Sequence, residues 1–133
     1  MIVLFANAAL IPFSAPVLAA DQVPLRGYFA STEDGFTGNF THLGRFTGVV
    51  GTQTQSTVWT AANGDTVTNV MTSFVLVEQI APGLFTYLQT LDITGGTGRF
   101  ANATGSATVT GTYSLITFEY DGWLEGTISQ PNH

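Results

Sequence analysis

Side chains of the types that usually carry out catalysis are scarce in this 133-residue sequence. It contains no cysteine, which excludes disulfides, thiolate catalysis and cysteine-ligated metal sites. Ser106 and Ser114 lack the flanking glycines of a G-x-S-x-G nucleophile motif. Of the two histidines, His42 and His133, only His42 lies well inside the chain. His42 is therefore the candidate for a catalytic acid or base, because an imidazole titrates near neutral pH.

Three carboxylates, those of Glu119, Asp121 and Glu125, lie close together in the sequence. Such a group could supply the acid and the nucleophile of a glycosidase, or the oxygen ligands of Ca²⁺. The same pattern is typical of a solvated turn, which is the interpretation we favour. A zinc site built on two histidines would also need carboxylates to complete it. We expect no metal site and no cofactor.

The glycine-rich run at residues 95–98 could cradle a phosphate only if it opened a helix. A dinucleotide motif needs G-x-G-x-x-G, and the third glycine is missing after Gly96 and Gly98. We instead expect all three glycines of the run to take positive φ in a bulged turn. Phe100 would then plug one end of the fold, and Arg99 would tether the turn to a carboxylate.

Composition limits the partners of the protein. Hydrophobic residues make up 44% of the chain and charged residues only 9%; three arginines and no lysine stand against nine Asp and Glu residues. The net charge of −6 would repel a phosphate backbone, so we expect no nucleic-acid binding.

The first 20 residues carry no charge and end in Ala19-Ala20, as a secretory signal peptide does. Pro12 and Pro16 interrupt the apolar run, so a membrane anchor is disfavoured and no stable membrane insertion is expected. The sequence thus predicts a signal peptide over residues 1–20, a single domain over 21–133, and a secreted or periplasmic location.

Strand periodicity dominates the rest of the chain. Apolar residues alternate with threonine, and no stretch after residue 25 repeats apolar residues at helical spacing. We predict strands that include residues 40–50, 84–94, 107–113, 115–120 and 123–128, with turns at Asn63-Gly64 (type I′, both φ positive), Pro82-Gly83 and Asp121-Gly122. Seven or eight short-looped strands form a barrel or a sandwich. Glycines inside strands, such as Gly44, Gly48 and Gly111, favour an antiparallel closed barrel, because tight barrels need kinks.

Residues 95–105 read GGTGRFANATG. This segment resembles the allene oxide cyclase and dirigent group of β-barrels, in which Gly-Gly-Thr-Gly-x-Phe-x-x-Ala-x-Gly links two long strands. The resemblance implies an eight-stranded barrel whose lumen is used without a cofactor. Allene oxide cyclases close a reactive fatty-acid epoxide, and dirigent proteins steer the radical coupling of phenols. The catalytic residues of these families lie outside the motif, so no residue role is carried over.

Alternation places several aromatic and polar side chains on the inner face of such a barrel. Apolar walls with a few polar groups suit a small hydrophobic or aromatic ligand. The predicted lining is Phe40, His42, Phe46, Trp59, Phe85, Tyr87, Gln89, Tyr113, Phe118 and Tyr120, with His42 the candidate acid or base. An eight-stranded barrel is also narrow enough for these side chains to fill it.

Three functions therefore stay open. The barrel could bind a small molecule and act as a cofactor-free cyclase or isomerase; it could be a lipocalin-like carrier; or it could be a structural surface protein with a filled core. Self-association is also left open.

Overall fold

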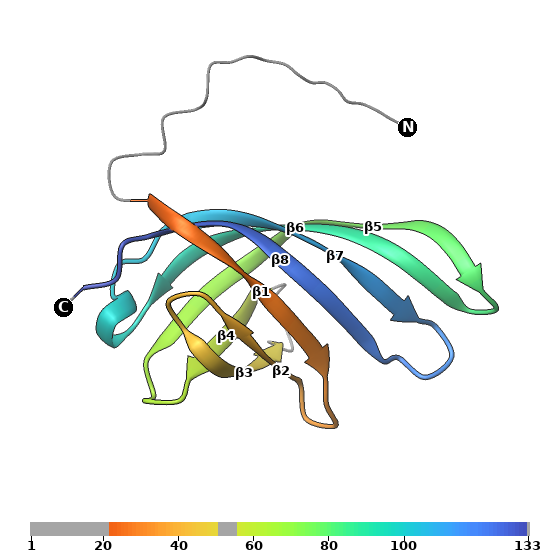
Figure 1. Ribbon diagram of the computed structural model, residues 1–133, viewed down its shortest axis with the longest axis horizontal. Coiled ribbons are helices and arrows are strands. Elements are labelled where there is room, and N and C mark those ends of the chain that lie inside the picture. The colour runs from red at the N-terminus through yellow and green to blue at the C-terminus, as the bar shows by residue number, and fades with distance from the viewer. Residues whose placement is uncertain (1–21, 51–55, 133) are drawn as a thin grey trace, which may run out of the picture.

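A computed structural model describes residues 22–50 and 56–132 of the chain. The predicted signal peptide lies outside the described residues, so export stays a prediction. The described part is a closed antiparallel barrel in which each strand pairs with the next and β1 pairs with β8 (Figure 1). Its elements are β1 (Gln22–Ser31), β2 (Phe36–Phe40), β3 (Gly44–Val50), β4 (Ser56–Ala61), β5 (Thr66–Ala81), β6 (Leu84–Gly96), the 3₁₀ turn η1 (Gly98–Phe100), β7 (Gly105–Ser114) and β8 (Tyr120–Ser129). The predicted all-β, eight-stranded closed barrel is confirmed.

The strands differ greatly in length, and this makes the two ends of the barrel unlike. β5 and β6 have 16 and 13 residues, whereas β2, β3 and β4 have 5, 7 and 6. Pairing between β4 and β5 extends from Thr60↔Thr66 to Ser56↔Val70, and β5 then continues beside β6 as far as Ala81. Figure 1 shows the β5–β6 and β7–β8 hairpins projecting together beyond the shorter strands. We call the end with these long hairpins the open end.

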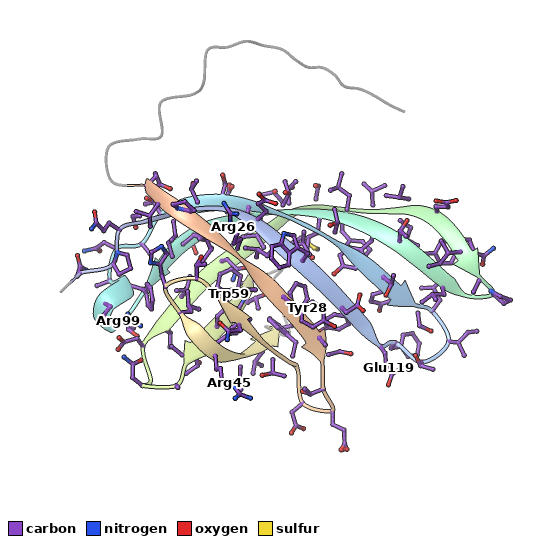
Figure 2. All side chains as sticks on the ribbon, viewed as in Figure 1. Arg26, Tyr28, Arg45, Trp59, Arg99 and Glu119 are labelled. Atoms are coloured by element: carbon purple, nitrogen blue, oxygen red, sulfur yellow. The ribbon has the colours of Figure 1, made fainter. Side chains whose placement is uncertain are left out.

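The opposite end, which carries η1, is filled, and we call it the closed end. Phe100 is only 1% exposed and Arg99 Nε lies 3.2 Å from Asp65 Oδ2, so the predicted plug and tether are both confirmed. Gly98 takes φ +60° as expected, but positive φ at Gly95 and Gly96 is wrong. Gly96 is needed for space instead, because a Cβ there would meet the carbonyl oxygens of Thr66 and Phe100. In Figure 2 Arg99 marks the closed end and Glu119 the open end.

The predicted turns at Asn63-Gly64 and Pro82-Gly83 connect β4 to β5 and β5 to β6. Within the first of these turns only Gly64 has positive φ, at +95°, so the type I′ assignment is wrong. The Asn63 side chain instead accepts a hydrogen bond from the Asp65 N–H at 3.0 Å, which closes the loop.

The predicted hairpin turn at Asp121-Gly122 is wrong, because both residues lie inside β8. The Asp121 carboxylate accepts hydrogen bonds from the Thr112 N–H and hydroxyl at 3.1 and 2.9 Å. Gly122 is required by packing, since a Cβ there would lie 2.7 Å from the Phe29 ring and the Tyr87 hydroxyl. The turn falls at residues 115–119 instead, where the Ser114 hydroxyl accepts from the Ile116 and Thr117 N–H groups.

The predicted continuous strand over residues 40–50 is also wrong. The chain turns at 41–43, and β2 and β3 pair on either side with Phe40 opposite Gly44. His42 takes φ +71° in this turn. Separately, among the described residues no helix is long and apolar enough to cross a membrane.

Inside the barrel, the alternation expected for β6 and β7 is confirmed. Tyr87, Leu91 and Val109 are buried, while Thr108 and Thr110 between the inward positions are exposed. The core is rich in aromatic rings: the Phe40 centroid lies 4.2 Å from that of Phe46 and 5.0 Å from that of Trp59. These inward rings close the base of a cavity that opens toward the long hairpins.

Candidate functional site

A cavity of about 530 Å³ occupies the interior toward the open end. This volume falls in the range of sites for drug-sized molecules. All eight strands contribute to its wall, which is formed by Phe29, Phe36, Phe40, Val50, Thr57, Trp59, Asn69, Met71, Phe74, Leu76, Tyr87, Gln89, Leu91, Val109, Tyr113, Leu115, Tyr120 and Leu124. The barrel is therefore hollow in one part and filled in the other.

The base and the mouth of the cavity differ in exposure. Leu124 and Val109 are each 1% exposed, whereas Leu76 and Leu115 are 37% and 48% exposed. We call these two leucines the mouth, since they line the cavity and also face solvent. Val50 and Phe74 also line the cavity and are 52% and 40% exposed, so the exposed rim of the cavity is apolar as well.

Aromatic rings form much of the wall near the mouth. The Tyr113 and Tyr120 rings stack with centroids 6.0 Å apart, and Phe74 stacks on Tyr87 at 5.1 Å. Phe29 packs 6.3 Å from Tyr120 in an edge-to-face arrangement. Such surfaces favour flat or aromatic apolar ligands through stacking as well as through burial.

Two of the lining tyrosines are held in the neutral form. The Tyr87 hydroxyl donates a hydrogen bond to the Asp121 carbonyl at 2.8 Å. Burial raises the pKa of Tyr87 far above its ordinary value, and the Asp121 charge adds to the effect. Burial, together with Tyr113, likewise raises the pKa of Tyr120. Neither phenol can act as a base at neutral pH.

Two carboxamides and one hydroxyl from threonine add polarity to the wall. Asn69 is 2% exposed and donates through Nδ2 to the Thr57 carbonyl at 3.3 Å. Gln89 is half-buried, and within the described part of the chain its side chain has no hydrogen-bond partner. The wall contains no Asp, Glu, Arg, Lys or His side chain among the residues that the structure describes. The cavity is thus apolar, uncharged and equipped with a few hydrogen-bonding groups.

Six of the ten residues predicted to line the lumen do so: Phe40, Trp59, Tyr87, Gln89, Tyr113 and Tyr120. Phe46 is buried beside them but packs behind Phe40 and Trp59, outside the lining. Phe85 is half-buried on β6 and also lies outside it.

The placement of His42 and Phe118 in the lumen is wrong. Both are exposed, Phe118 at 66%, and both lie in turns with positive φ, at +71° and +63°. The prediction assumed that both residues lie within strands, where side chains alternate between the two faces. The chain turns at both positions, so the alternation does not apply to them. His42 consequently has no access to a molecule inside the barrel.

Sequence reasoning missed the contribution of β5, which supplies four lining residues. Asn69 and Met71 point inward at odd positions, but Phe74 and Leu76 do so at even positions. The β5–β6 register shifts between Met71 and Ser73, so a bulge reverses the parity there. The sequence signal for this bulge was the adjacent polar pair Thr72-Ser73 inside an apolar run. Both hydroxyls lie 2.6 Å from Thr90 Oγ1.

Of the acidic group predicted as a solvated turn, Glu119 does lie exposed in the turn before β8, but Asp121 and Glu125 lie within β8. Asp121 bonds to Thr112, while Glu125 accepts from Trp123 Nε1 at 3.4 Å on the outside of β8. Across residues 22–50 and 56–132, no group of three His, Cys, Asp or Glu side chains is arranged to hold a metal ion.

Comparisons with known proteins leave the family open. No family model, curated protein or solved structure matches this chain.

Proposed function

We propose that the barrel binds an uncharged, largely apolar small molecule in its cavity. The observation that carries the proposal is the 530 Å³ hollow, walled by aromatic and aliphatic side chains from all eight strands and open at Leu76 and Leu115. A filled barrel of structural use alone would not retain such a space, because a close-packed interior is more stable than one with voids.

Charge complementarity supports a neutral ligand. An ion in this cavity would lose its hydration and find no counter-charge among the described lining residues. The net charge of −6 on the protein would further disfavour an anionic molecule approaching the mouth.

Binding without chemistry is favoured over catalysis. General acid–base catalysis needs a group that titrates near the working pH and reaches the substrate. His42 is outside the cavity, and Tyr87 and Tyr120 stay protonated. The cyclase or coupling activity implied by the resemblance at residues 95–105 would have to act through the shape of the cavity and the neutral phenols and amides of its wall.

The test uses N-phenyl-1-naphthylamine, a neutral probe whose fluorescence rises in an apolar site. We expect saturable binding of one probe per chain and a rise in melting temperature with probe concentration; ligand at 100 times its Kd adds about 2.7 kcal/mol. Val109→Phe should reduce binding, because the larger ring enters the base of the cavity. Thr108→Phe, the same addition on the exposed face of β7, is the matched control.

His42→Ala should bind the probe as the natural protein does. Equal binding by the natural protein and Val109→Phe would contradict the proposal, as would the lack of any response to the probe, fatty alcohols, phenols and terpenoids. Recovery of a chemically altered ligand would instead establish catalysis.

A further inference from the structure

Asn69 is the one buried polar side chain in the described part of the barrel. It lies on β5 two residues beyond the fully buried Val67, opposite Thr57 on β4 and Ile93 on β6. Its neighbours along the inner face of β5 are thus apolar, and it faces the cavity at depth. A leucine of similar shape would fit this position without any polar group to satisfy.

The Asn69 carboxamide is only partly satisfied by the protein. One hydrogen of Nδ2 goes to the Thr57 carbonyl at a long 3.3 Å. Over the described residues, Oδ1 accepts no hydrogen bond, and the second hydrogen of Nδ2 has no acceptor. Asn69 lines the cavity, so a molecule inside the barrel can supply the missing partners of these atoms.

Thr57 adds a second polar group at the same place. It is the direct cross-strand neighbour of Asn69, so the two Cβ atoms lie about 5 Å apart on one face of the sheet. Thr57 also lines the cavity, and its hydroxyl has no partner within the described chain. The two side chains therefore present an amide acceptor, an amide donor and a hydroxyl toward one small volume.

We infer that Asn69 and Thr57 recognise an uncharged hydrogen-bond donor on the ligand, a hydroxyl or an N–H group. The ligand group donates a hydrogen bond to Asn69 Oδ1. The Thr57 hydroxyl forms a second hydrogen bond with the same ligand group. An ammonium would bring a charge for which the wall has no counter-ion. An ether or ester oxygen could accept from the second Nδ2 hydrogen but would leave Oδ1 unpaired, whereas a hydroxyl can both donate and accept. The apolar body of the ligand then extends along β5, past Met71 and Phe74, toward the mouth.

This inference rests on the proposed function, and three matched probes separate the two. Biphenyl tests apolar binding, 4-phenylphenol adds a donor, and 4-methoxybiphenyl keeps the oxygen but removes the donor. Their dissociation constants are measured by displacement of N-phenyl-1-naphthylamine. For each variant we take the ratio of the Kd of 4-methoxybiphenyl to the Kd of 4-phenylphenol. The hydration of the free probes is the same for every variant, so a change in this ratio between variants reports on the protein alone.

Asn69→Leu should lower this ratio roughly three- to tenfold, the equivalent of one net hydrogen bond. Asn39→Leu makes the same change at an exposed position on β2 and should leave the ratio unchanged. Should Asn69→Leu not fold, Thr57→Val removes only the hydroxyl and should lower the ratio in the same direction.

Failure of all three probes to bind the natural protein would overturn the proposed function itself. Binding of all three with a ratio that neither Asn69→Leu nor Thr57→Val changes would overturn only the assignment of the donor site. A ratio lowered equally by Asn39→Leu would also overturn it, because the effect would not come from the cavity.

Discussion

Replacing Phe100 with alanine should destabilise the barrel without weakening ligand binding. The Phe100 ring is 1% exposed at the closed end, under the Arg99 guanidinium, whose Cζ lies 4.8 Å from the ring centroid. Deleting a buried phenylalanine ring costs about 3–5 kcal/mol, from lost burial plus the void that remains. Phe100 is outside the cavity wall, so the Kd for N-phenyl-1-naphthylamine of the folded variant should be unchanged.

The assay is urea denaturation followed by Trp59 fluorescence in a Trp123→Phe background, with extrapolation to water. Phe118→Ala is the matched control, because it deletes the same ring from a site that is 66% exposed and should cost less than about 0.5 kcal/mol. A loss below about 1 kcal/mol in Phe100→Ala, or equal losses in the two variants, would refute the assignment of Phe100 as the plug.

Two further predictions concern the same end of the barrel. Gly98→Ala should cost about 1 kcal/mol or more of the free energy of unfolding, because Gly98 has φ +60° and a Cβ would collide with the Asp65 carboxylate. Gly95→Ala, with open space around the Cβ position, is the control in the same denaturation assay. Equal losses in the two variants would contradict the strain argument. The pKa of Asp65 is held below its ordinary value, first by the Arg99 backbone N–H and then by the side chains of Arg99 and Asn63. A carboxyl with a lowered folded-state pKa stabilises the fold above its unfolded pKa and loses that contribution as pH falls, so stability should drop below about pH 4. Asp65→Asn should show a shallower drop between pH 5 and pH 2 in denaturation midpoints. Asp34→Asn, the same change at an exposed position of the β1–β2 turn, is the matched control.

The fold was predictable because its signals are local and repeated. Ala107 and Val109, which alternate with the exposed Thr108 and Thr110, define an inner face that the structure retains. The glycine-rich run likewise predicted the plug and the tether, since Phe100 and Arg99 follow directly on the turn that aims them. Five of the lining residues followed from the same period-two rule, and Trp59 was predicted as a neighbour of the early aromatic face.

The remaining errors arise where one residue changes the parity or the direction of the chain. The turn at His42 and the bulge after Met71 depend on cross-strand register, which alternation along a single strand does not contain. Asp121-Gly122 has the composition of a turn, yet Gly122 is needed because Phe29 and Tyr87 occupy the space of its side chain. Such requirements come from residues about 35 and 93 positions away in sequence, so they are visible only in three dimensions.

The two ends of the barrel differ in how well they should tolerate substitutions. The filled end holds the fold together through Phe100, Val67 and Ile128, none of which touches the cavity. The mouth residues Leu76 and Leu115 are already half exposed, so exchanging them forfeits little burial. Selection or design can therefore substitute the mouth residues to suit a new ligand while the residues of the closed end stay unchanged.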